Sequence, residues 1–164
     1  SVPIILLSPR GRRLNQNIVE EISKQGEVVL ICGRYEGVDE RIRKYLVTDE
    51  ISIGDYVLSG GELASMVLID AVSRLISGVV GSIESTRDDS FTTGLLQHPQ
   101  YTRPSNFRGW QVPGVLVSGN HAQITIWRRQ ESLRRTFILR PELLESANLT
   151  NEDILFIDSL QNQK

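Results

Sequence analysis

Three short stretches of this 164-residue chain contain residue types that could bind a ligand: Ser8–Gly11, Gly33–Gly37 and Ser52–Gly61. Each follows an apolar run typical of a buried strand, and ligands of open α/β sheets bind outside the carboxyl ends of the strands. Glycines at such positions either form tight turns or let the backbone approach a ligand closely. Their gathering on one expected sheet edge, with Tyr35 and Tyr56 among them, favours one shared ligand pocket.

The residues around these glycines indicate what kind of ligand the pocket would take. Neither common nucleotide motif, G-x-G-x-x-G or G-x-x-x-x-G-K-[ST], is present. A phosphate site favours a basic residue beside its glycines, whereas Gly60-Gly61 is followed by Glu62 and the preceding loop carries Asp55. These surroundings suit a ligand with apolar, aromatic and cationic parts, such as an adenosyl sulfonium.

Other kinds of chemistry find little support in the sequence. His98 and His121 have no partners at zinc-ligand spacing, and no Ser/His/Asp arrangement can be identified. The single Cys32 lies in an apolar run, which favours a buried structural thiol over a catalytic one and suits the reducing cytoplasm. No apolar run approaches the roughly 18 residues that cross a bilayer.

The expected elements alternate along the first half of the chain, which predicts an α/β fold with a parallel sheet. Ser8–Gly11 is expected to be a turn, and Gly60-Gly61 to lead into the last helix of this half. The strands are predicted over Val2–Leu7, Val28–Cys32 and Ile51–Leu58, and the helices over Asn15–Lys24, Asp39–Tyr45 and from the Gly60-Gly61 turn to Ile76.

The second half has a different pattern. A polar stretch, residues 81–93, predicts a mobile linker. Asn120 could cap a helix over His121–Thr136, with Ile126, Leu133 and Phe137 on one side and Arg128 and Arg135 on the other. A last helix, Asn151–Leu160, has Thr150 as its expected N-cap and Asp153 in its first turn, and Leu116-Val117 is a weak strand candidate.

Basic charge is concentrated between Tyr101 and Arg140. This segment carries seven arginines and one acid, a net charge of +6, whereas the other 124 residues carry 11 basic and 19 acidic residues, a net charge of −8. Arginine suits bidentate contacts with phosphate and stacking on bases. Charge alone leaves two readings open, a solvated charged face and a nucleic-acid contact.

Longer motifs resemble the bacterial tRNA (guanine-N1)-methyltransferase (TrmD) family. They are LSPRGRRLNQ, CGRYEGVDERI, SIGDYVLSGGELASMVLIDAVSR, DSFTTGLLQHPQYTRP and VPGVLVSGNH…WRR, in the family's order from about Leu6 to Leu144. The resemblance implies the SPOUT class: an α/β fold whose parallel sheet carries a deep trefoil knot, followed by a small, mainly helical C-terminal domain. The expected domains are 1–80, knotted and binding S-adenosylmethionine, a flexible linker at 81–95, and 96–164, helical and binding tRNA.

The resemblance also implies the reaction, which the residue pattern alone does not reach. Family members transfer methyl from S-adenosylmethionine to N1 of the guanine just 3′ of the tRNA anticodon. They act as cytoplasmic homodimers that share each active site between subunits. The family is reported to use Mg²⁺, although no residue cluster here points to a metal site.

Site residues follow from the same motif matches. Asp89 aligns with the family's proposed general base and Arg74 with its supporting arginine; otherwise, Asp89 is a solvated linker acid and Arg74 a surface partner of Asp70. Arg128, Arg129 and Arg135 are expected to contact tRNA. The residues expected around the methyl donor are Leu6, Ser8, Pro9 and Gly11; Gly33, Tyr35 and Glu36; and Ile53, Gly54, Asp55, Tyr56, Val57, Leu58, Gly60 and Gly61.

Two departures from the family pattern bear on function. Ala64 stands where the family usually has proline. The chain also begins almost at the LSP strand, whereas the family has a preceding section with a G-G-G-P-G loop. We therefore expect a piece of a longer protein that is inactive alone. The alternatives are a non-catalytic RNA-binding fragment and another SPOUT methyltransferase acting on rRNA.

Overall fold

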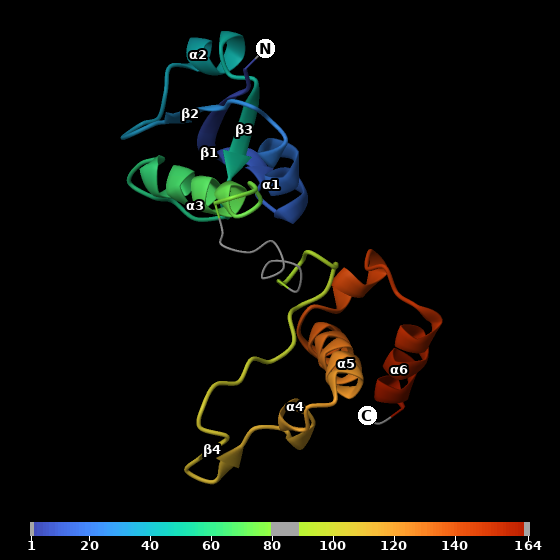
Figure 1. Ribbon diagram of the computed structural model, residues 1–164. Helices are drawn as coiled ribbons and strands as arrows, with labels where there is room; N and C mark the ends of the chain where they lie inside the picture. The colour runs from blue at the N-terminus through green and yellow to red at the C-terminus, as the bar shows by residue number, and fades with distance from the viewer. Residues whose placement is uncertain (1, 80–88, 163–164) are drawn as a thin grey trace. The chain divides into compact units, whose positions relative to one another are not determined.

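The computed structural model describes residues 2–79 and 89–162, and these fall into two compact units, residues 1–83 and 84–164 (Figure 1). Each unit has its own buried core. One gathers around Ile5, Ile51 and Leu68, and the other around Leu95, Leu133 and Ile157.

The first unit is built on a three-stranded parallel sheet of β1 (Ile4–Arg13), β2 (Val29–Cys32) and β3 (Asp49–Ser52), in the order β2-β1-β3. Helices α1 (Gln16–Ser23), α2 (Glu40–Tyr45) and α3 (Glu62–Ser73) alternate with or follow the strands. The predicted α/β fold with a parallel sheet is therefore confirmed.

Helices α1 and α3 pack beside each other on one side of the sheet, and α2 lies away from them (Figure 1). Ile5 and Leu7 lie on the same face of β1 and pack in one core with Ile18 of α1 and Leu68 of α3. The side chain of Asn15 caps α1 by accepting from the N–H of Ile18 at 3.1 Å, which explains why this helix begins where the sequence predicts.

Strand β1 does not end at a turn over Ser8–Gly11, as the sequence predicts. It continues to Arg13, and its register against β3 shifts there, so that Ile51 is opposite both Leu7 and Arg12. The intervening residues bulge out of the ladder. Gly11 explains how this is possible: a Cβ there would lie 2.3 Å from the Ile51 backbone nitrogen.

Arg12 holds the end of β1 in place after the bulge. Its guanidinium donates to both carboxylate oxygens of Glu21 on α1, at 2.8 and 2.9 Å, and to Asp49 of β3, at 2.6 Å. The Arg12 hydrogen bonds lower the pKa of the Glu21 carboxyl below its ordinary value. One side chain thus joins a strand, a helix and the neighbouring strand.

Two other predictions for this unit are wrong. The strand expected over Ile51–Leu58 ends at Ser52, because the Ser52 hydroxyl bonds the Gly54 backbone and Gly54 takes a φ of +153°. Residues 53–59 form a loop instead. Cys32 is half-buried, not buried, because β2 is an edge strand of the sheet.

The second unit begins with a non-helical segment, residues 89–105, and a short hairpin of β4 (Asn106–Phe107) with β5 (Trp110–Gln111). It contains α4 (Gly114–Val117), α5 (His121–Leu139), a 3₁₀ helix η2 (Pro141–Glu145) and α6 (Asn151–Gln161). The weak strand candidate Leu116-Val117 is therefore wrong, because these residues close α4.

Both long helices of this unit begin at the predicted caps. Asn120 accepts from the Gln123 N–H at 3.2 Å, and Thr150 forms a reciprocal capping box with Asp153. The predicted apolar side of α5 is only partly correct. Leu133 is 1% exposed in the core, whereas Ile126 is 58% exposed two turns earlier.

We expect Gly11→Ala to destabilise the first unit by about 3 kcal/mol or more, because its methyl group would overlap the β3 backbone, which has little room to move. Urea unfolding at equilibrium measures this change. Gly26→Ala is the matched control, since nothing lies within 4 Å of a Cβ at Gly26. Equal stabilities for the two variants would show that β3 yields at the crossing.

Candidate functional site

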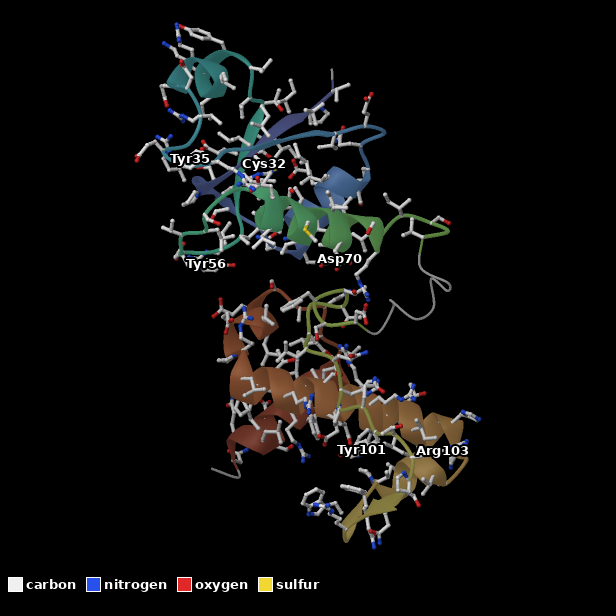
Figure 2. The ribbon with its side chains drawn as sticks, turned by 90° about the vertical axis from the view of Figure 1, so that its left-hand side faces the viewer. Cys32, Tyr35, Tyr56, Asp70, Tyr101 and Arg103 are labelled. Carbon is white, nitrogen blue, oxygen red and sulfur yellow. The ribbon has the colours of Figure 1, made fainter. Side chains whose placement is uncertain are left out.

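A pocket of about 400 Å³ lies in the first unit, at the edge where the strands end. Its lining comes from residues 6–10, 33–38, 51–54 and 56–61, with Ala64 of α3. The three loops singled out from the sequence therefore surround one cavity, as expected. Figure 2 shows Tyr35 and Tyr56 at the same end of this unit.

Most of the residues predicted for the methyl donor line this pocket, but two do not. Gly11 packs against the β3 backbone, and Asp55 forms an ion pair with Arg13. Those that line the pocket are Leu6, Ser8, Pro9, Gly33, Tyr35, Glu36, Ile53, Gly54, Tyr56, Val57, Leu58, Gly60 and Gly61.

Direct backbone contacts join two of the loops. The N–H of Gly61 donates to the carbonyl of Gly33 at 2.9 Å, and Arg34 forms an isolated bridge with Gly60. A Cβ at Gly61 would lie 2.9 Å from Cα of Cys32, so a side chain there would push the two loops apart. The glycine pair that opens α3 is needed for this close approach.

Arg34 is a pocket residue that was not predicted from the sequence. It lies beside Gly60, and its guanidinium bonds Glu62, which lowers the pKa of that exposed carboxyl. A basic residue thus does lie beside Gly60 in the fold, although Glu62 follows this glycine pair in the sequence. Its position between Gly33 and Gly37 could have indicated that Arg34 lines the pocket. Its contact with Glu62 of α3 could not be predicted, because that contact depends on the fold.

The pocket wall consists mainly of apolar side chains and backbone atoms. Two of its charged residues already have partners: Arg34 pairs with Glu62, and Arg10 lies 3.8 Å from Glu40. Tyr35 stands at the mouth with 97% of its surface exposed and a φ of +54°. A pocket of this size and lining suits a small organic ligand better than a polyphosphate.

The two predicted catalytic residues belong to different units. Arg74 caps the C-terminus of α3 in the first unit, and its N–H bonds the Asp70 carbonyl at 3.2 Å. Asp89 begins the described part of the second unit, where its carbonyl accepts from Thr92 at 3.3 Å. Asp88 lies outside the described residues, and the pairing of Arg74 with Asp89 stays a prediction.

The described part of the expected linker, residues 89–95, folds as a turn. Phe91 donates its N–H to the Leu95 carbonyl at 2.8 Å, and Leu95 is buried in the core of the second unit. Asp89 therefore stands at the start of a segment that this core anchors.

The arginines of the second unit do not all have the same role. Arg129 donates to both carboxylate oxygens of Asp153, at 3.1 and 2.7 Å, and to the carbonyl of Asn148 at 3.2 Å. Its partner Asp153 is 5% exposed, so this pair joins α5 to α6 inside the unit. Arg128 and Arg135 are exposed on α5.

The β4–β5 hairpin presents two aromatic rings to solvent. Phe107 and Trp110 are both exposed, with ring centroids 6.0 Å apart, and the Arg108 guanidinium lies 5.3 Å from the Phe107 ring. Exposed aromatic and arginine side chains are the groups that stack on unpaired bases. Arg108 was predicted only as part of the basic segment, and the two exposed rings were not predicted from the sequence.

A sequence model of the tRNA (guanine-1)-methyltransferase TrmD family matches residues 1–146. The chain belongs to this family. Curated tRNA (guanine-N(1)-)-methyltransferases from Dehalococcoides mccartyi strain CBDB1 and Moorella thermoacetica are 61% and 57% identical to it. The alignments cover 96% and 99% of this chain, and 64% and 65% of those relatives. The chain thus spans slightly less than two thirds of their length.

Family membership confirms the resemblance drawn from the motifs. Among the described residues, no group of three or more His, Cys, Asp or Glu side chains gathers as a metal site would. No helix among residues 2–79 and 89–162 is long and apolar enough to span a bilayer.

We expect Asp153→Asn to lower the free energy of unfolding of the second unit by about 1–3 kcal/mol at pH 7, because Arg129 loses its buried anion. The Arg129 hydrogen bonds lower the pKa of Asp153 below its ordinary value. The stabilisation is therefore complete above a pH of about 4 and is lost as the pH falls through the lowered pKa. Thermal melts between pH 2 and 7 test this.

The control for this test is Asp158→Asn on the exposed side of α6. It should leave the melting temperature within about 2 °C at every pH. If the Asp153→Asn and wild-type proteins differ as much at pH 2 as at pH 7, the carboxylate charge is not the source of the stability.

Proposed function

We propose that the protein to which this chain belongs methylates N1 of a guanosine in tRNA, the one just 3′ of the anticodon, with S-adenosylmethionine as methyl donor. Family membership over residues 1–146 is the observation that carries this proposal. The glycine-lined pocket supports it independently, because it offers a donor site of suitable size.

The residues of the pocket fit the donor. Gly33, Gly60 and Gly61 leave room where a Cβ would meet Val38, Glu62 or Cys32, so the backbone itself forms the wall. Leu6 and Ile53 offer apolar surface for an adenine ring, and Glu36 lies on the wall for a cationic group. When bound, S-adenosylmethionine supplies an electrophilic methyl group.

Asp89 and Arg74 have the chemical roles that the acceptor requires. N1 of guanine carries a proton, and a carboxylate must remove it as the new N1–CH₃ bond forms. The N1–H electron pair forms this bond, the proton passes to Asp89, and S-adenosylhomocysteine leaves. Arg74 would stabilise the negative charge that develops on O6 of the base.

The knot of the SPOUT class belongs to the same proposal. The segment entering α3 passes directly against the loop after β2, through the contact between Gly61 and Cys32–Gly33. Such a crossing of backbones supports a knotted arrangement in the first unit.

A homodimer with shared active sites is also proposed. Helix α3 packs against the sheet through Ala64 and Leu68, yet it exposes large apolar side chains on its other side. An exposed apolar face of this kind is typical of an interface. The exposed residues are Leu63, Met66, Val67 and Ile69.

The tRNA partner is supported by the second unit. Arg128 and Arg135 are exposed on α5 and available for backbone phosphates. The exposed rings of the hairpin are available to stack on unpaired bases. Arg129 is a weaker candidate than the sequence predicts, because Asp153 holds it. A cytoplasmic location is part of the same proposal, and Mg²⁺ use stays a prediction from the family alone.

In the complete protein, we expect Asp89→Asn to lower the methyl-transfer rate by a factor of about 100 or more, because N1 keeps its proton. Single-turnover transfer of labelled methyl to a tRNA transcript measures the rate, and calorimetry should show unchanged donor binding. Asp158→Asn should transfer at the normal rate. Near-normal turnover of Asp89→Asn would show that Asp89 is not the base. Methylation of an rRNA fragment in place of tRNA would show that tRNA is not the substrate.

We expect Gly60→Val to abolish donor binding, because its side chain would enter the space beside Arg34 and Glu62. These neighbours are flexible side chains, so the variant should fold. Gly54→Val, beside the Tyr56 ring, should weaken the donor in the same way. Calorimetric titration measures both, with Gly26→Val as the control outside the pocket. Unchanged affinity in a folded Gly60→Val protein would mean that this glycine only forms a turn.

A further inference from the structure

The segment that follows Asp89 is folded back on itself and held in the core of the second unit. The Phe91 N–H donates to the Leu95 carbonyl at 2.8 Å, and the Gln97 N–H donates to the Ser90 hydroxyl at 2.9 Å. Leu95 anchors this turn in the core, with 1% of its surface exposed. Asp89 thus directly precedes a turn that is closed by two hydrogen bonds and buried at one end.

One side chain of α5 joins this turn to the helix. Thr136 is completely buried, and its hydroxyl donates to the carbonyl of Ser132, one helical turn earlier, at 2.7 Å. The same hydroxyl oxygen accepts the N–H of Leu96 at 2.9 Å. A buried N–H that loses its acceptor costs about 1–3 kcal/mol. The position of Leu96 is therefore tied to that of α5.

Two further contacts fix the middle of the turn. Gly94 has a φ of +77°, and a Cβ there would lie 3.1 Å from Cα of Ala147, which follows η2. Phe91 takes a φ of +76°, which is uncommon for a residue with a side chain, and the Arg140 guanidinium lies 5.9 Å from its ring. Such a backbone conformation persists only where its surroundings hold it. The turn is thus held in one shape by α5 and the chain that follows it.

Packing alone does not require a hydroxyl at position 136. Valine has the shape of threonine without the oxygen, and it would suit a fully buried position better unless that oxygen is hydrogen-bonded. Apart from its bond within the helix, the Thr136 hydroxyl serves the backbone of Leu96. What the hydroxyl secures is therefore the path of the segment that begins at Asp89.

We propose that Thr136 is a positioning residue for methyl transfer: it fixes segment 90–97 against α5 and thereby holds Asp89 where it can take the proton of guanine N1. That Asp89 is the base rests on the proposed function. A general base must lie within about 3 Å of the atom that carries the proton, and a misplacement of about 1 Å can lower a rate about 100-fold. Helix α5 also exposes Arg135, the neighbour of Thr136, toward solvent. One helical turn thus carries both the anchor of the base and a proposed tRNA contact.

Single-turnover methyl transfer to tRNA by the complete protein tests this proposal. Thr136→Val keeps the shape of the side chain and removes the hydroxyl, so we expect the transfer rate to fall about tenfold while the donor and tRNA affinities stay unchanged. Thr136→Ser restores the hydroxyl and should restore most of the rate. The matched control is Thr125→Val, which should transfer at the normal rate. Thr125 is exposed on the same helix and donates to the His121 carbonyl at 3.0 Å.

Hydrogen exchange followed by mass spectrometry shows whether the anchor is released. Exchange across residues 90–97 should be faster in Thr136→Val and close to wild type in Thr136→Ser, because the Leu96 N–H loses and regains its acceptor. If Thr136→Val does not fold, Ser90→Ala takes its place. It removes the acceptor of the Gln97 N–H at a half-buried position and should also slow transfer.

A double-mutant cycle with Asp89→Asn distinguishes positioning of the base from a general loss of structure. If Thr136 acts through Asp89, adding Thr136→Val to Asp89→Asn should lower the rate little further. If Thr136→Val lowers the rate by the same factor with and without Asp89→Asn, Thr136 acts through another group and the proposal is wrong.

The rates of the single variants separate this proposal from the proposed function. A normal rate in Thr136→Val, or in Ser90→Ala, together with slow transfer by Asp89→Asn, would overturn the role of the anchor alone. A wild-type protein that transfers no methyl group to tRNA would refute the proposed function, and the role of Thr136 with it.

Discussion

The close approach of backbones at the carboxyl edge of the parallel sheet is the constraint on which the first unit depends. Gly61 donates to the Gly33 carbonyl at 2.9 Å, and Gly11 lies so near β3 that a Cβ would meet it at 2.3 Å. No other residue type gives the backbone this room. These contacts bring the loop after β2, the bulge in β1 and the start of α3 around one cavity.

The character of the cavity follows from this construction. Because the backbone makes much of the wall, few charged groups are available to bind an anion, and the pair Arg34–Glu62 neutralises one of them. The groups proposed to act on the tRNA lie elsewhere: Asp89 and most of the arginines belong to the second unit. The proposed donor site and most of the groups proposed to contact RNA therefore belong to two different compact units of the chain.

The arginines of the second unit show why charge counts overestimate a binding surface. Arg129 is required by the buried Asp153, and Arg140 pairs with Glu142, so neither charge is free for a partner. Arg103 and Arg128 differ, because both line a pocket of the second unit whose described wall includes no acid. What distinguishes these arginines is the environment that packing makes for each one, and this depends on residues far away in the sequence.

Local chemistry was sufficient to predict part of this protein. Asn120 and Thr150 cap helices as the sequence predicts, because a cap depends on neighbours within three residues. Alternating apolar runs predicted the parallel sheet, and the glycine-rich motifs predicted the family. Only the tertiary structure decided that β1 continues through Pro9, that Arg34 meets Glu62, and that His98 and Arg128 line one pocket. Each of these depends on contacts between residues distant in the sequence, which local propensity and spacing do not encode.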